Sequence, residues 1–129
     1  MPTVLKFEDL EVWQLAREIN EELFAIIKRL RDSKEFELAA QLDRSSGSVM
    51  DNVAEGFERD GNKEFTQFLA ISKASLAEVK SQLYRVKNRL TITEEEFESL
   101  VAKCNLLSAK LAAFINYLRT SNYKGNKFK

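Results

Sequence analysis

Histidine is absent from the 129 residues, and cysteine occurs once, at Cys104. Without histidine there is no Ser–His or Cys–His pair to activate a nucleophile, and no Glu-x-x-His motif of the kind that binds iron in di-iron bundles. A single cysteine excludes a disulfide within the chain, and its core position on the last expected helix predicts a buried, inert thiol. We therefore expect no catalytic residue, no metal and no cofactor in a protein that is not an enzyme.

Helix-breaking residues are also scarce, with one proline at position 2 and four glycines. Leucine, alanine, glutamate, lysine and arginine dominate the composition, and these residues favour helix. A chain of this length that is 44% hydrophobic can build one core. We expect a single all-α domain over residues 1–129, with residues 1–8 and 121–129 extended or frayed.

Long apolar runs are missing as well. No stretch approaches the roughly 20 residues that cross a bilayer, and the N-terminus lacks a basic segment followed by an apolar one. We expect a cytoplasmic protein with no membrane partner.

The charges cancel to zero overall but are unevenly distributed along the chain. Residues 35–62 carry two basic and seven acidic side chains, whereas residues 63–91 carry six basic and two acidic ones. This polarity predicts either attraction between two helices or steering of a charged partner. Overall neutrality argues against indiscriminate binding to phosphate.

Apolar residues recur four and three positions apart in four segments, a heptad pattern typical of helices that pack side by side. The pattern predicts helices at about 9–31, 33–59, 63–90 and 94–120. The expected inner residues, in helix order, are Val12, Ala16, Ile19, Leu23, Ile26, Leu30; Phe36, Ala39, Leu42, Val49, Val53, Phe57; Phe65, Leu69, Ser72, Leu76, Val79, Leu83, Val86, Leu90; and Phe97, Leu100, Cys104, Leu107, Leu111, Phe114, Leu118.

Turn signals separate these segments. Asp32 with Glu35, and Thr93 with Glu96, have the spacing of capping boxes, and Gly61 can adopt the positive φ of a turn, after which Asn62 can cap the next helix. Short connections between long helices make neighbours antiparallel, so we expect an up-down-up-down four-helix bundle.

Polar residues interrupt the apolar pattern of the second and third helices at positions that we expect to face each other. Such groups next to a core need hydrogen-bond partners, and a polar layer can fix the register of two helices. Ligand binding at the same groups is the alternative, and Glu55 with Glu78 is the only carboxylate pair suited to acid–base chemistry. The expected layer comprises Ser48, Asn52, Glu55, Ser75, Glu78 and Gln82.

Basic side chains follow the third helix. Lys73, Lys80 and Lys87 recur at intervals of seven, and Arg85 and Arg89 accompany them. A basic line with a nearby aromatic residue can follow a phosphate backbone, which makes these five residues candidate contacts to nucleic acid. The alternative is a solvated face, or one paired with the acidic second helix.

Two helices have more apolar residues than one seam requires. The surplus predicts either a wide core-facing stripe or an interface with further copies of the chain. The interface candidates are Trp13, Phe24, Ile27, Val101 and Ile115.

The segment Arg44-Ser-Ser-Gly-Ser-Val-Met-Asp-Asn-Val-Ala-Glu-Gly-Phe57, followed by Asn62-Lys-Glu-Phe and Ser75-Leu-Ala-Glu, resembles proteins encoded in intervening sequences of bacterial 23S rRNA genes. The resemblance extends from about Phe7 to Tyr117. It implies a cytoplasmic bacterial four-helix bundle that assembles into a ring, typically of five protomers, without established enzymatic activity.

A similar bundle is the accessory protein of diversity-generating retroelements, in which a basic pentameric ring binds nucleic acid and a reverse transcriptase. The resemblance therefore implies that RNA or a nucleic-acid enzyme is a partner, although this chain is neutral rather than basic. Many relatives have proline where this chain has Met50, so we expect a straighter second helix here.

Overall fold

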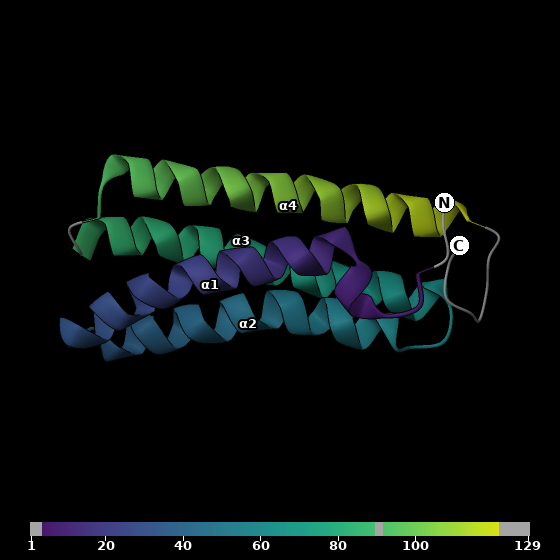
Figure 1. Ribbon diagram of the computed structural model, residues 1–129, viewed down its shortest axis with the longest axis horizontal. Helices are drawn as coiled ribbons and strands as arrows, with labels where there is room; N and C mark the ends of the chain where they lie inside the picture. Colours follow the sequence, from purple (N-terminus) through teal and green to yellow (C-terminus); the bar gives the residue numbers. More distant parts are fainter. Residues whose placement is uncertain (1–3, 90–91, 122–129) are drawn as a thin grey trace.

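The computed structural model describes residues 4–89 and 92–121, which form four long helices (Figure 1). A short 3-10 helix, η1 (Phe7–Asp9), precedes α1 (Glu11–Asp32), α2 (Phe36–Phe57), α3 (Asn62–Arg89) and α4 (Glu94–Thr120). Each helix runs opposite to the one before it, so α1 begins and α4 ends at the same end of the bundle (Figure 1). The predicted all-α, up-down-up-down four-helix fold is confirmed.

The heptad positions supply the core because residues three and four apart lie on one face of a helix. All six predicted inner residues of α1 are buried, and so are the seven described ones of α3. Leu90, the last predicted member, lies outside the described residues.

Two aromatic residues expected in the core lie at its edge. Phe36 is 62% exposed, and Leu38 is buried in its place, because Leu38 is one helical turn before Leu42 while Phe36 projects from another side of α2. Phe114 is half-buried, with its ring edge-on to that of Phe65 at 5.4 Å between centroids.

The turn between α1 and α2 differs from the predicted capping box. Asp32 is the last residue of α1, and Glu35 at the N-cap position of α2 makes no side-chain cap bond. Instead, the amide of Glu35 donates to the carbonyl of Leu30 at 2.8 Å, and that of Lys34 to Arg31 at 2.9 Å. These two bonds form a Schellman motif, in which Lys34 has a φ of 64°.

At the other two turns, the expected glycine conformation and the expected capping box are confirmed. Gly61 has a φ of 85°, as the predicted turn requires. Thr93 and Glu96 form the predicted capping box: the Thr93 hydroxyl accepts from the Glu96 amide, and the Glu96 side chain accepts from the Thr93 amide. α4 therefore begins where its sequence specifies.

The N-terminal segment is more ordered than expected. Residues Phe7–Asp9 form η1 instead of an extended or frayed segment, and Phe7 packs edge-on against Trp13 at 5.2 Å between ring centroids. The expectations for residues 1–3 and 122–129 lie outside the described part of the chain.

Ion pairs bridge the seam between α1 and α4. On α4 their members recur every seven residues, so they follow one edge of that helix. The three pairs are Arg29–Glu96 at 2.8 Å, Glu22–Lys103 at 2.6 Å and Glu11–Lys110 at 3.1 Å.

Within the described residues, none of the helices combines the length and apolar character needed to cross a membrane.

Candidate functional site

Serine and glutamine side chains join α2 to α3 across the interior. The Ser45 hydroxyl donates to Gln82 Oε1 at 2.5 Å, and the hydroxyls of Ser48 and Ser75 share a hydrogen bond of 2.8 Å. Ser72 donates to the backbone carbonyl of Val49 at 2.6 Å. These bonds connect positions 23 to 37 residues apart, so they depend on how the two helices are aligned.

Asn52 belongs to this layer indirectly. Its amide nitrogen donates to the backbone carbonyl of Ser48 at 2.8 Å and to the Ser48 hydroxyl at 2.9 Å, both within α2. Asn52 therefore orients Ser48 toward Ser75 instead of spanning the helices itself.

The two carboxylates expected in the layer lie outside it. Glu55 pairs with Arg59 one turn along α2 at 3.1 Å, and Glu78 pairs with Arg44 at 3.3 Å, with both carboxylates largely exposed. The expectation was wrong because long side chains at the edge of the interface can extend to arginines in solvent. The proposed acid–base pair is not formed.

The layer is satisfied internally. In the described part of the chain, every buried side-chain nitrogen or oxygen has a hydrogen-bond partner. Ser48, Asn52 and Glu55 also border a shallow hollow of about 440 Å³ on the outer side of α2. The contacts of the layer resemble those of a polar core, in which each group is occupied by another group of the same chain.

Gly56 is a packing residue that the sequence analysis did not single out. A Cβ atom at this position would lie 2.6 Å from Phe68 Cβ and 3.0 Å from a ring carbon of Phe65. The absence of a side chain therefore lets α2 and α3 approach closely near their shared turn. A glycine inside an otherwise regular helix was the available signal.

The five basic candidates form two lines instead of one. Lys73, Lys80 and Lys87 lie on the side of α3 that faces α4, where Lys87 pairs with Glu94 and lies over the ring of Phe97. The separation arises because residues seven apart share a helix face, whereas those five apart do not.

The arginines lie on the other side of α3, facing α2. Arg85 donates to Gln41 at 2.9 Å, and Arg89 pairs with Glu35 at 3.2 Å. Of the contacts between the two helices, Arg89–Glu35 joins an acidic residue beside α2 to a basic residue of α3, as the alternative interpretation of the charge pattern expects, whereas Arg44–Glu78 has its cation on α2.

Two of the interface candidates belong to the core. Ile27 is 2% exposed and Ile115 is 7% exposed. Each lies next to a seam position on the helix, and the core is wide enough to include it.

The other three interface candidates reach the surface. Trp13 is half-buried against Phe7 and Arg17, and Val101 is half-buried in α4. Phe24 is 66% exposed. Other large apolar residues are also exposed: Leu5, Phe36, Ile71, Tyr84 and Leu106.

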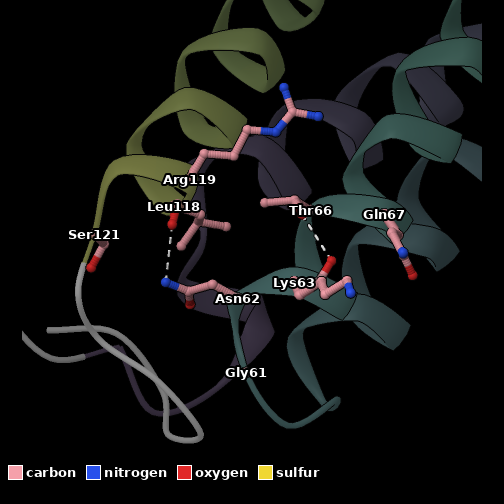
Figure 2. A pocket seen from close by; sticks show the side chains of 8 residues that line it. All are labelled: Gly61, Asn62, Lys63, Thr66, Gln67, Leu118, Arg119 and Ser121. Atoms are coloured by element: carbon pink, nitrogen blue, oxygen red, sulfur yellow. Dashed lines mark hydrogen bonds between the residues drawn. The ribbon is translucent and has the colours of Figure 1, made fainter.

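A hollow of about 610 Å³ lies where α3 begins and α4 ends (Figure 2). The Asn62 amide group donates to the carbonyl of Leu118 at 3.1 Å, and the Thr66 hydroxyl donates to that of Lys63 at 2.8 Å. Figure 2 shows the Arg119 side chain extending away from Asn62. The Asn62 bond ties two helix ends together, and none of the predicted site residues lines this hollow.

Two groups have strongly shifted pKa values. Hydrogen bonds from Arg29 and from the Thr93 amide lower the pKa of Glu96 to about 2. Burial raises the pKa of the Cys104 thiol to about 11. Both shifts follow from the packing of α4, and the described residues contain no cluster of three acidic or cysteine ligands for a metal.

The fold and the polar layer define an antiparallel four-helix bundle whose second and third helices are joined through serine and glutamine side chains. The chain belongs to the 23S rRNA-intervening sequence protein family, whose model matches residues 8–113. The family assignment agrees with the resemblance carried by the segment around Asn52 and Gly56.

The fold is shared with a solved structure from Bacteroides thetaiotaomicron VPI-5482, a protein with unknown function from the S23 ribosomal protein family. The two are 24% identical, with a TM-score of 0.75 over 81% of this chain and 97% of the other. No curated protein matches this sequence.

Proposed function

We propose that this protein is a non-catalytic, cytoplasmic building block that assembles with copies of itself and serves as a scaffold. The observation that carries the proposal is the exposure of large apolar side chains on a bundle whose interior is already packed. Phe24, Phe36 and Leu106 are 66%, 62% and 49% exposed, although their helices bury a complete inner seam.

Exposed apolar groups of this size cost free energy in water. Covering one contributes roughly 1.5–3 kcal/mol when the side chain becomes fully buried. Surfaces that gather such groups are typical of interfaces between proteins. The resemblance to ring-forming bundles favours a ring of five protomers, with RNA or a nucleic-acid enzyme as the partner of the assembled ring.

Native mass spectrometry and sedimentation velocity test the assembly. We expect a species with five times the 14.8 kDa mass of one chain at micromolar concentration. A protein that sediments only as a monomer over this range would contradict the proposal.

A second candidate function is direct binding to RNA, and Lys73 and Lys80 favour it. Neither ammonium group has an ion-pair partner among the described residues, whereas most other cations of the helices are paired. Both lie on one face of α3, and Lys80 is one turn before Tyr84, whose half-exposed ring packs edge-on against Phe97 and leaves part of its surface open to a base.

Fluorescence anisotropy with a labelled structured RNA tests this candidate. Binding should weaken as salt rises, and replacing both lysines with glutamate should abolish it. Replacing Lys34 and Lys6 with glutamate provides a control with the same change in charge. Equal losses for both double variants would show that net charge, not the α3 line, governs binding.

A further inference from the structure

The outer surface of α4 has a second heptad line. Between Ser99 and Thr120, one line of residues spaced alternately three and four apart is exposed throughout and contains no charged side chain. The line consists of Ser99, Ala102, Leu106, Ala109, Ala113, Asn116 and Thr120. A line of this spacing matches the surface of another helix, and its small residues allow close approach. We call it the α4 outer seam.

A different apolar face lies over α1 and α2. The Arg31–Asp43 ion pair joins these two helices at 3.7 Å. Phe24 lies seven residues before Arg31 on α1, and Phe36 lies seven residues before Asp43 on α2. Because residues seven apart share a helix face and the two helices are antiparallel, both phenylalanines lie along the α1–α2 groove, on opposite sides of this ion pair and roughly 20 Å apart along the axis. We call this pair the aromatic face.

The two faces differ in the size of their side chains and lie on different helices of the bundle. One presents large exposed rings, and the other presents alanines flanking a single leucine. In the view of Figure 1, α4 and α2 lie along opposite edges, with α1 and α3 between them. Two different faces that fit each other produce head-to-tail contact, which closes into a ring when the rotation allows.

Charges at the margins of these faces also match. Lys28, one turn beyond Phe24, is exposed and has no ion-pair partner among the described residues. Glu98, one turn before Ala102, is exposed and likewise unpaired within the described chain. When α1 of one copy runs antiparallel to α4 of the next, placing Phe24 over Ala102 brings Lys28 to Glu98.

We propose that the α4 outer seam of one protomer packs on the Phe24 part of the aromatic face of the next copy, with Phe24 beside Ala102 and Leu106 and with Lys28 facing Glu98. This inference rests on the self-assembly proposed above and specifies which surfaces meet. The occupant of each face is a second copy of this chain.

The first test introduces a large charged side chain into the seam. Ala102→Arg should reduce the assembled species to monomers in sedimentation velocity, because its long side chain would fill the space that the Phe24 ring of the next copy requires. Ala74→Arg on exposed α3 is the matched control and should leave assembly unchanged. Arginine favours helix, so circular dichroism should show both variants folded.

The second test exchanges charges. Lys28→Glu and Glu98→Lys should each weaken assembly about threefold or more, and the double exchange should restore it, since exposed ion pairs contribute modestly. A double variant no better than the single ones would overturn the pairing of these residues.

The outcomes distinguish the two proposals. If the unmodified protein is monomeric, the proposed self-assembly fails and this inference fails with it. If it assembles but Ala102→Arg assembles as Ala74→Arg does, the inference is wrong while the proposed self-assembly stands.

Discussion

Two glycines inside α2 have opposite surroundings. A Cβ atom on Gly56 would collide with Phe68, whereas one on Gly47 would meet nothing within 4 Å. The same replacement by alanine should therefore change stability in opposite directions at the two positions.

We expect Gly56→Ala to lower the free energy of unfolding by about 1–2 kcal/mol, because separating α2 and α3 costs more than the gain in helix propensity. Gly47→Ala should raise it by roughly 0.5–1 kcal/mol, since alanine restricts the unfolded chain more than glycine does. Urea unfolding at one protein concentration measures both. A stabilising Gly56→Ala would show that the two helices can separate at little cost.

Lys34 occupies the position of the Schellman motif that glycine usually occupies. Its φ of 64° places a β-carbon in the left-handed region, which is unfavourable for a residue with a side chain. Lys34→Gly should raise the free energy of unfolding by about 0.5–1 kcal/mol.

The neighbouring Ser33 is the control, because its φ of −89° suits any residue. Ser33→Gly should destabilise the protein slightly, through greater freedom of the unfolded chain. Equal effects of the two substitutions in thermal unfolding would argue against relief of strain at Lys34.

At the scale of helices, removing the polar layer between α2 and α3 would test whether its buried hydrogen bonds specify the register of the two helices. Removing it with Ser72→Ala, Ser75→Ala and Gln82→Leu together eliminates hydrogen bonds that require one alignment of the helices. We expect the triple variant to keep its helical content but to lose dispersion in its amide NMR spectrum as alternative alignments become populated.

Ser81→Ala, on the exposed side of α3, is the control for this experiment and should leave the spectrum unchanged. A triple variant with full dispersion and equal stability would show that apolar packing alone sets the register.

The capping box of α4 makes the α1–α4 seam sensitive to acid. Because the Arg29 hydrogen bond and the Thr93 amide lower the pKa of Glu96 from its ordinary 4.5 to about 2, the folded state favours the ionised form. Its stabilising contribution is therefore fully present above about pH 4.5 and is lost as pH falls toward 2.

We expect Glu96→Gln to reduce stability at pH 7 and to flatten its decline between about pH 5 and 2. Chemical unfolding at several pH values measures the slope, and Glu95→Gln, next to it but exposed and outside the capping box, is the control. Parallel pH curves for Glu96→Gln and the unmodified protein would contradict this assignment.

Over the whole molecule, the sequence predicted features that depend on local periodicity. The inner seams of α1 and α3 follow directly from four-three spacing, and Thr93 with Glu96 carries its own capping signal. Phe36 was misplaced because it lies six residues before Leu42, about 120° away around α2, whereas Leu38, four residues before Leu42, faces the core.

The width of the core and the reach of side chains were less predictable. Ile27 lies beside a seam position, and only the packing of neighbouring helices decides whether such a residue is buried. Glu55 and Glu78 have the spacing of interior groups, yet arginines within reach hold them at the surface. These outcomes depend on three-dimensional neighbours and not on sequence spacing.

The burial of Cys104 makes the chain's only thiol a reporter of the whole bundle. With its pKa raised to about 11 and its side chain 1% exposed, it should react with a maleimide orders of magnitude more slowly than a free thiol at pH 7.5. Urea below the unfolding midpoint should accelerate labelling, and mass spectrometry measures its rate. Labelling as fast as that of glutathione would show that Cys104 is accessible in the native state.

Each added mass would then record one occasion on which α4 separated from its neighbours. The labelling rate of Cys104 therefore measures how often α4 separates from the other helices of the bundle.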